Sequence, residues 1–130
     1  MENLVFYRCD ICGNLIVMIE NSGNIPQCCG QAMERLEAGK VDAVKEKHVP
    51  VITCDDKKVT ITVGEIPHPM SELHYIEWIC LQTDRGMHMR RLYPGEAPSV
   101  HFRLCASENP ICAYEYCNLH GLWQCCVPKE

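Results

Sequence analysis

Cysteine is the feature that most constrains this chain, because it supplies 11 of the 130 residues. In a short secreted chain, this content would predict a disulfide scaffold. Residues 1–9 show neither the basic region nor the apolar stretch of a signal peptide, so we expect a cytoplasmic protein with reduced thiols. Grouped cysteines then indicate metal ligands, and scattered ones indicate small buried hydrophobic residues.

Composition narrows the class of protein further. With 47% hydrophobic and 22% charged residues, the chain should be globular, and its length suits one ordinary domain or a small module joined to a domain of about 90 residues. Its net charge of −5 argues against nucleic acid or an anionic membrane as a partner. The longest apolar run, Leu15–Ile19, is too short to span a bilayer, so we expect no membrane partner.

The residue pattern of the sequence changes around residues 37–47. Residues 1–36 hold four closely grouped cysteines and end in a helix-compatible stretch, Gln31–Leu36. We therefore expect a metal-binding module at 1–36, a linker and loop at 37–47, and a second domain at 48–130.

The second domain reads as short β-strands. Val59, Ile61 and Val63 alternate with two threonines, which is typical of a half-buried strand. Turn-forming residues separate further β-rich runs at regular spacing, which predicts an all-β, antiparallel sandwich of the immunoglobulin-like kind. The expected strands are residues 51–54, 59–63, 75–81, 87–92, 99–104 and 113–116.

The first candidate metal site combines Cys9, Cys12, Cys28 and Cys29. Two cysteines separated by two residues and followed by Gly13 form a metal-binding knuckle. The second pair is adjacent, so a single ion bound by all four thiolates should be held in a distorted tetrahedron. Spacing alone leaves zinc and iron open, and a pair of disulfides is the remaining alternative.

A second candidate site combines four histidines with one cysteine. These residues occupy predicted loops or strand ends, where a sandwich gathers its functional groups. Five such ligands do not suit structural zinc, which is nearly always four-coordinate, but they suit a redox iron with one open position, tuned by a thiolate. The set is His48, His68, His74, Cys117 and His120.

Two charged residues precede the first of these ligands. Glu46 or Lys47 could reach the open position through a small loop movement, although taken in isolation each would be interpreted as a solvated side chain. His88 and His101 fall inside strand-like runs, and we expect them to be structural.

Five motifs, in order along the chain, resemble desulfoferrodoxin, the two-iron form of superoxide reductase. They are Cys9-x2-Cys12 with Cys28-Cys29, Glu46–Val51, His68–Met70, His74–Ile79 and Glu115–Trp123. The resemblance implies a desulforedoxin-like module with an iron on the four cysteines. It also implies an immunoglobulin-like domain whose iron has the four histidines in a plane and Cys117 as axial ligand.

The resemblance also implies an activity: the ferrous site gives one electron to superoxide, and hydrogen peroxide leaves without formation of dioxygen. Lys47 would attract and orient the anion and help to supply protons, while Glu46 would occupy the open position in the resting ferric state. Members of the family are usually homodimers and are re-reduced by rubredoxin-like electron donors.

Other readings remain open from the sequence. The chain could be a rubredoxin-type electron-transfer protein with an inert β domain, a zinc-stabilised interaction module, or a dismutase rather than a reductase. The cysteines outside the motifs should mostly be buried thiols, with the terminal pair exposed and prone to oxidation: Cys54, Cys80, Cys105, Cys112, Cys125 and Cys126.

Overall fold

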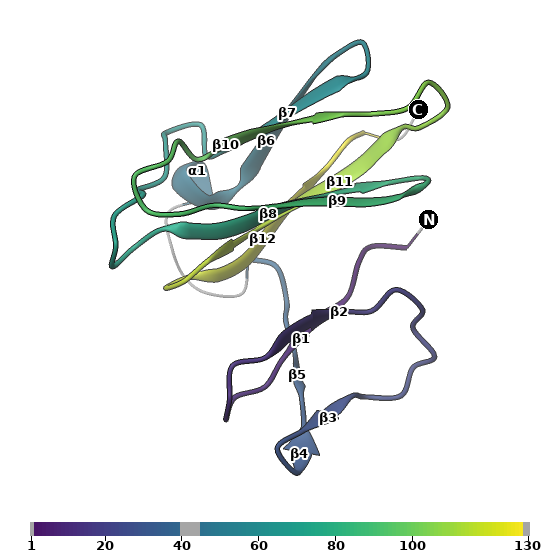
Figure 1. Ribbon diagram of the computed structural model, residues 1–130, viewed down its shortest axis with the longest axis vertical. Coiled ribbons are helices and arrows are strands. Elements are labelled where there is room, and N and C mark those ends of the chain that lie inside the picture. The colour runs from purple at the N-terminus through teal and green to yellow at the C-terminus, as the bar shows by residue number, and fades with distance from the viewer. Residues whose placement is uncertain (1, 40–44, 129–130) are drawn as a thin grey trace. The chain divides into compact units, whose positions relative to one another are not determined.

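The computed structural model describes residues 2–39 and 45–128, and the side chain of Glu46 is not among the described parts. The chain divides into two compact units, Met1–Glu37 and Ala38–Glu130 (Figure 1). Residues 40–44, in the middle of the expected linker, lie outside the described residues.

The first unit is a small β structure around the four cysteines. Strands β1 (Phe6–Arg8), β2 (Leu15–Val17) and β5 (Glu34–Arg35) form a sheet in the order β2-β1-β5, and β3 (Gln27–Cys28) pairs with β4 (Gln31–Ala32). Its core is built on Tyr7, Cys9 and Met33.

The expected helix at Gln31–Leu36 is wrong, because these residues contribute to β4 and β5 instead. An isolated helix of this length is unstable in water, since few main-chain bonds offset the cost of nucleation. Here Met33, between the two strands, is buried in the core, and the neighbouring residues pair in sheets.

The second unit is a sandwich of two antiparallel sheets, so the predicted all-β, immunoglobulin-like architecture is confirmed. Figure 1 shows the two sheets as separate layers. One sheet has the order β10-β7-β6, from β6 (Pro50–Asp55), β7 (Lys58–Val63) and β10 (Ser99–Arg103). The other has the order β12-β11-β8-β9, from β8 (Ile76–Thr83), β9 (Gly86–Arg91), β11 (Pro110–Cys117) and β12 (Gly121–Cys126).

Strand β12 was not predicted, because its glycine and paired cysteines do not read as a β-rich run. The short helix α1 (Lys45–His48) precedes β6. No helix in the described ranges is both long and apolar enough to cross a membrane.

The apolar residues that alternate along β7, as predicted from the sequence, lie in the core of the sandwich. Val59, Ile61 and Val63 of β7 are fully buried and pack in one cluster with Ile79 and Leu81 of β8. Burial of an aliphatic side chain of this size stabilises the fold by roughly 1.5–3 kcal/mol. This rigid core holds the loops at the sandwich ends in place.

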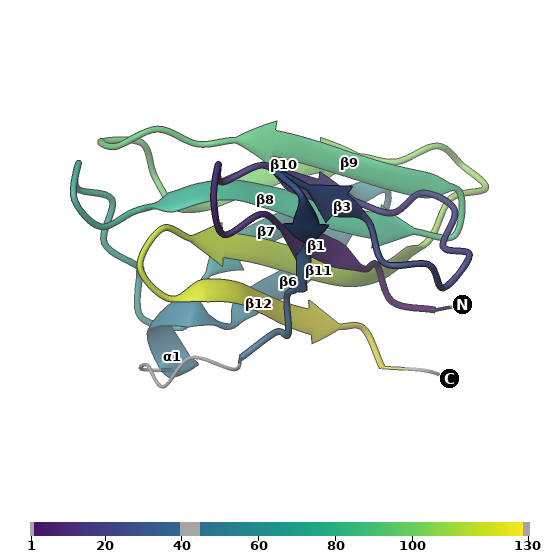
Figure 2. The same ribbon diagram turned by 90° about the horizontal axis from the view of Figure 1, so that it is seen from below.

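One end of the sandwich carries a register shift between β8 and β11. Tyr116 pairs with Trp78, whereas Cys117 pairs with Ile76, so Glu77 is an extra residue in β8. Such bulges re-aim side chains and often lie beside functional sites. Both views place α1 at the same end of the sandwich as the turn between β11 and β12 (Figures 1 and 2).

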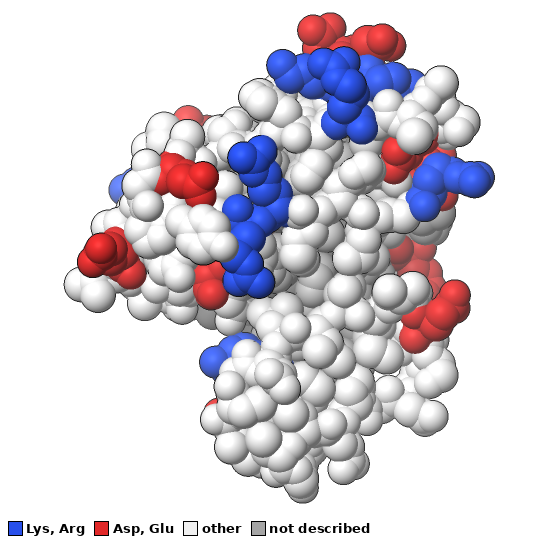
Figure 3. Space-filling model, in the orientation of Figure 1, with Lys and Arg blue, Asp and Glu red and all other residues white. Residues whose placement is uncertain are grey.

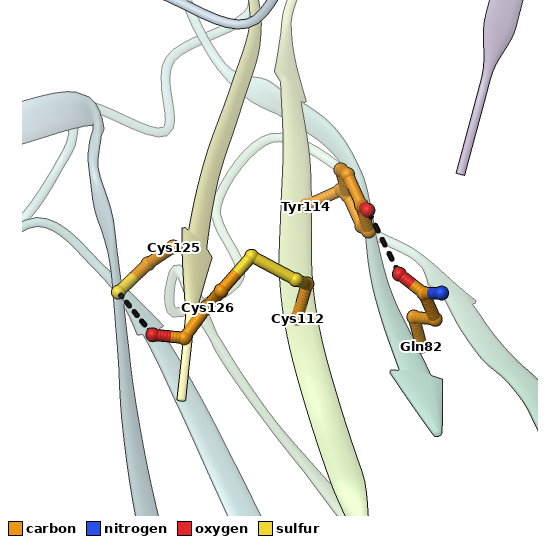
Figure 4. Close-up of a disulfide and its surroundings, with 5 residues drawn as sticks. All are labelled: Gln82, Cys112, Tyr114, Cys125 and Cys126. Atoms are coloured by element: carbon orange, nitrogen blue, oxygen red, sulfur yellow. Dashed lines mark hydrogen bonds between the residues drawn. A yellow bond between two sulfur atoms is a disulfide. The ribbon is translucent and has the colours of Figure 1, made fainter. Parts of the chain in front are cut away.

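The cysteines outside the motifs match the expectation of buried, reduced thiols with an oxidation-prone terminal pair only in part. Cys112 and Cys126 are opposite each other in β11 and β12 and form a disulfide (Figure 4). Most of the other cysteines outside the motifs lie in edge strands or turns, where side chains are less buried than in the core. Cys80 is buried, Cys125 is half-buried, and Cys54 and Cys105 are exposed.

Charged side chains of both signs share the face seen in Figure 3. Lys and Arg groups gather there in separate clusters, and the cluster at the top of the view adjoins Asp and Glu groups. An anion approaching this face would therefore depend on local positive charge rather than on a broad positive field.

Candidate metal centres

The first centre begins with a tight knuckle after β1. The main-chain N–H of Gly13 donates to the oxygen of Cys9 at 2.9 Å, and the N–H of Cys9 donates to the oxygen of Asn14 at 2.8 Å. Gly13 has a φ of 82°, which a residue with a side chain rarely adopts. This turn places the Cys12 N–H 3.5 Å from the Cys9 sulfur.

The adjacent cysteines complete the group at the β3–β4 hairpin. Cys29 has a φ of 53°, so the chain enters the left-handed region between the two strands and turns there. The Sγ atoms of Cys12 and Cys28 are 3.6 Å apart, and those of Cys28 and Cys29 are 3.9 Å apart. All four sulfurs, including that of Cys9, lie within 4.8 Å of one another.

The four thiols fit a metal ion. Sulfurs bound tetrahedrally at about 2.3 Å would be about 3.8 Å apart, close to the observed spacing. A main-chain hydrogen bond from Cys12 lowers the pKa of Cys9 to about 6, whereas the neighbouring Cys12 sulfur raises the pKa of Cys28 and raises that of Cys29 to about 12. Four thiolates so close together therefore require a cation to ionise together.

The second group is assembled from three separate segments. His48 ends α1, His68 and His74 lie between β7 and β8, and Cys117 ends β11 three residues before His120. His48, His68 and Cys117 are buried, and the other two are partly exposed.

The four imidazoles form a ring in which neighbours meet edge to face. In the order His48, His68, His74, His120, successive ring centroids are 4.7, 4.6 and 5.1 Å apart, and the closing distance from His120 to His48 is 4.8 Å. The interplanar angles of these four contacts lie between 78° and 84°. His48 and His74 are on opposite sides of the ring, 6.3 Å apart and inclined by 30°.

Ring nitrogens converge at the centre of this arrangement. The Nε2 of His48 lies 3.0 Å from the Nδ1 of His120 and 3.2 Å from the Nε2 of His68. Two nitrogens bound at right angles, each about 2.1 Å from one metal ion, would be about 3.0 Å apart. The Sγ of Cys117 lies 3.8 Å from the Nδ1 of His120, and it forms one group of potential ligand atoms with His48, His74 and His120.

Hydrogen bonding and burial prepare these side chains for a cation. His68 Nδ1 lies 2.6 Å from the Pro69 oxygen, which can only accept, so Nδ1 carries the proton and Nε2 keeps its lone pair. Burial lowers the pKa of His68 to about 4 and also lowers that of His74, whose buried Nε2 has no hydrogen-bond partner among the described residues. Burial raises the pKa of Cys117, so a nearby metal ion would offset the cost of its thiolate.

Two acidic residues and one lysine lie near this group in sequence or space. Lys47, half-buried in α1, lies close enough for its charge to contribute to the lowered pKa of His74. The side chain of Glu46 lies outside the described parts. Glu115 is fully buried, and burial raises its pKa well above the ordinary value.

Sequence reasoning missed two residues that support the group. Asn118 bonds to the main chain on both sides of His74, and Trp123 bonds to His120 and packs against His48. The motif containing both residues was identified, but side-chain contacts of this kind leave no sequence signal.

His88 and His101 lie apart from the group, as expected. His88 bonds to the carboxylate of Glu108, and His101 bonds to the hydroxyl of Thr60.

Together, the fold and the two side-chain groups define a two-unit β protein with a tetracysteine metal centre and a histidine–cysteine metal centre. Sequence profiles agree: that described as Desulfoferrodoxin matches residues 40–126, and that described as Desulfoferrodoxin, N-terminal domain, matches residues 1–36. The chain belongs to the desulfoferrodoxin family. This family carries two iron sites, and the two groups are where this chain can hold them.

Curated relatives match nearly the whole chain. A desulfoferrodoxin homolog of Archaeoglobus fulgidus is 42% identical over 123 residues, covering 95% of this chain and 97% of the relative. The desulfoferrodoxin of Nitratidesulfovibrio vulgaris is 42% identical over 118 residues, covering 91% of this chain and 92% of the relative.

Solved structures support the same family. The superoxide reductase of Treponema pallidum superposes with a TM-score of 0.80 at 37% identity, covering 95% of this chain and 99% of that one. The one-iron superoxide reductase of Giardia intestinalis has a TM-score of 0.56 at 34% identity, covering 65% of this chain and 100% of that one. The expected enzyme class, superoxide reductase, is thus confirmed.

Proposed function

We propose that this chain is a superoxide reductase that converts superoxide to hydrogen peroxide at the histidine–cysteine centre, without producing dioxygen. The observation that carries the proposal is the ring of four imidazoles with the Cys117 sulfur beside it. The names of the solved relatives supply the substrate.

The donor set supports iron rather than structural zinc. The ion would be held by five side chains: His48, His68, His74, Cys117 and His120. Structural zinc is nearly always four-coordinate, whereas five protein ligands leave an octahedral ion one open position. Bound ferrous iron would supply the single electron that superoxide accepts.

The stoichiometry of the reaction sets two requirements for the residues around the ion. Superoxide gains one electron and two protons to become hydrogen peroxide, so the site must attract an anion and admit protons. Lys47 carries the positive charge, which would draw superoxide in and orient it. The Cys117 thiolate would donate electron density toward the ion, and Glu46 would fill the open position in the resting ferric state.

The first centre would hold a second iron on Cys9, Cys12, Cys28 and Cys29. We propose the division already read from the sequence: a desulforedoxin-like module at 1–36, a linker and loop at 37–47, and the reductase domain at 48–130. A cytoplasmic homodimer re-reduced by a rubredoxin-like donor completes the proposal.

The test is the visible absorption of the anaerobically purified protein, before and after mild oxidation, followed by product analysis. Tetracysteine ferric bands at the start and a new thiolate-to-iron band on oxidation are expected. One hydrogen peroxide per superoxide, without dioxygen, would distinguish reduction from dismutation.

The rival electron-transfer reading predicts a different outcome. A rubredoxin-type protein would show only the tetracysteine bands and would not consume superoxide beyond the reducing equivalents stored there. A colourless protein that stays colourless after reconstitution with iron would contradict both readings and favour the zinc-stabilised module.

A further inference from the structure

One side chain, that of Asn118, joins the two loops that carry His74 and His120. Its Oδ1 accepts a hydrogen bond from the main-chain N–H of Tyr75 at 2.9 Å, and its Nδ2 donates to the main-chain oxygen of Leu73 at 3.0 Å. An N–H can only donate and a carbonyl can only accept, so this orientation of the amide is the one that satisfies both partners. Asn118 therefore forms hydrogen bonds with the main chain on both sides of His74.

The position of Asn118 at the end of a strand explains why a side chain takes this role. Cys117 and Ile76 are the last paired residues of β11 and β8, and the N–H of Asn118 still donates to the Tyr75 oxygen at 3.2 Å. A regular ladder would return the second bond to the main-chain oxygen of residue 118. Here the chain turns toward His120, and the side-chain oxygen of Asn118 takes the place of that carbonyl.

Contacts inside the His74 loop do not perform the same task. The N–H of Ser71 donates to the His74 oxygen at 3.0 Å, and the N–H of His74 donates to the Ser71 oxygen at 3.2 Å. These bonds fix the shape of the loop itself. The bonds of Asn118 instead fix the place of the loop relative to Cys117 and His120, which follow from another strand.

We infer that Asn118 is a positioning residue, which sets the separation between His74 and the Cys117–His120 turn and thereby the geometry of the histidine–cysteine centre. It needs an acceptor and a donor on a short arm, and asparagine supplies both. The inference rests on the proposed function only in taking iron as the ion at that centre.

The test compares Asn118→Ala with Asn109→Ala in the iron-loaded, full-length protein. Asn109 is a matched control because its Nδ2 also donates one bond in a turn, to Asp84 at 3.0 Å. With a ferrous chelator in excess, Asn118→Ala should release iron from the histidine–cysteine centre at least tenfold faster than wild type. The tetracysteine centre is the internal control, and its absorption should decay at an unchanged rate.

A second measurement separates positioning from general loosening. In metal-free protein, amide hydrogen exchange at Tyr75 should accelerate at least tenfold in Asn118→Ala. Asn118→Asp keeps the acceptor for Tyr75 but loses the donor for Leu73, so it should preserve most of that protection and release iron at an intermediate rate.

Unchanged iron release in Asn118→Ala, or equal acceleration at both metal centres, would overturn the inference. If wild-type protein takes up no iron at the histidine–cysteine centre, the proposed function fails. Zn²⁺ release from that centre and Tyr75 exchange then decide the role of Asn118 by the same criteria.

Discussion

The indole nitrogen of Trp123 donates a hydrogen bond to the main-chain oxygen of His120 at 3.0 Å. The same indole ring lies 5.0 Å from the imidazole of His48, inclined by 31°. Trp123 is only 3% exposed, so it contacts two histidines of the ring from beneath the surface. The two histidines come from distant segments, and Trp123 supports both.

Trp123→Phe should separate these two contacts. The phenyl ring keeps most of the packing against His48, while the bond to His120 is lost, so the free energy of unfolding should fall by about 1 kcal/mol. The thiolate-to-iron band of the oxidised protein should shift, with the tetracysteine bands unchanged. Trp78→Phe, whose ring stacks on Tyr116 instead, is the control and should leave the band in place.

Lys47→Ala should slow the reaction with superoxide several-fold at low ionic strength. Removing the cation lowers the local attraction for the anion, and added salt should shrink the difference because it screens this attraction. Pulse radiolysis at several salt concentrations measures both effects. Lys58→Ala is the control, because it makes the same change in net charge away from the site. Lys58 begins β7, about 17 Å along the strand from Val63, the end that leads into the loop of His68. Equal rates for wild type and Lys47→Ala at low salt would contradict the role of Lys47.

Cys117→Ser should abolish the thiolate-to-iron absorption and most of the activity, because a neutral hydroxyl donates far less charge than a thiolate. Cys80→Ser is the matched control: Cys80 is also buried, and burial raises the pKa of its thiol to about 12. The control should retain both iron spectra. Retention of the thiolate-to-iron band in Cys117→Ser would show that another residue provides the sulfur.

The strands of the sandwich could be predicted because their signal is local. Alternation in Val59–Val63 and the turn residues at 55–58 correspond to β7 and to the β6–β7 hairpin. Strand β12 escaped prediction because it depends on pairing with β11 rather than on its own composition, and Gln31–Leu36 was misread because tertiary pairing overrides weak helix propensity.

Prediction of the candidate sites divides in a similar way. Chemistry-bearing residues such as His68 stand out by type and setting, so all of the histidines in the ring were singled out from the sequence. The roles of Asn118 and Trp123 could not be predicted, because their contacts cross between loops. The Cys112–Cys126 disulfide was missed because the two residues meet only when β11 and β12 pair.

Glu108 should make stability depend on pH below about 4.5. A hydrogen bond from Thr83 at 2.6 Å and another from His88 at 2.8 Å lower the pKa of Glu108 from 4.5 to about 2. Because the pKa is depressed in the folded state, the stabilisation is fully present above pH 4.5 and is lost as the pH falls toward 2.

The measurement is denaturant unfolding of wild type and Glu108→Gln from pH 6 to pH 2, approximately the window set by that pKa shift. Wild type should be the more stable at pH 6, and the difference should narrow toward pH 2. Metal loss in acid affects both proteins, so the difference between them isolates Glu108. A difference that stays constant with pH would contradict this assignment.

Opening the Cys112–Cys126 disulfide should lower the free energy of unfolding without disturbing either metal centre. The bridge closes a loop with a sequence separation of 14 residues, and loops of this size restrict the unfolded chain by about 3 kcal/mol. Cys126→Ser and wild type treated with a phosphine reductant should therefore show similar losses in denaturant unfolding. Cys125→Ser, next to the bridge but outside it, should match untreated wild type and should respond to the reductant to the same extent as wild type does. If reduction left the unfolding midpoint of wild type unchanged, the bridge would contribute nothing to stability, and the pairing of β11 with β12 alone would hold this edge of the sandwich.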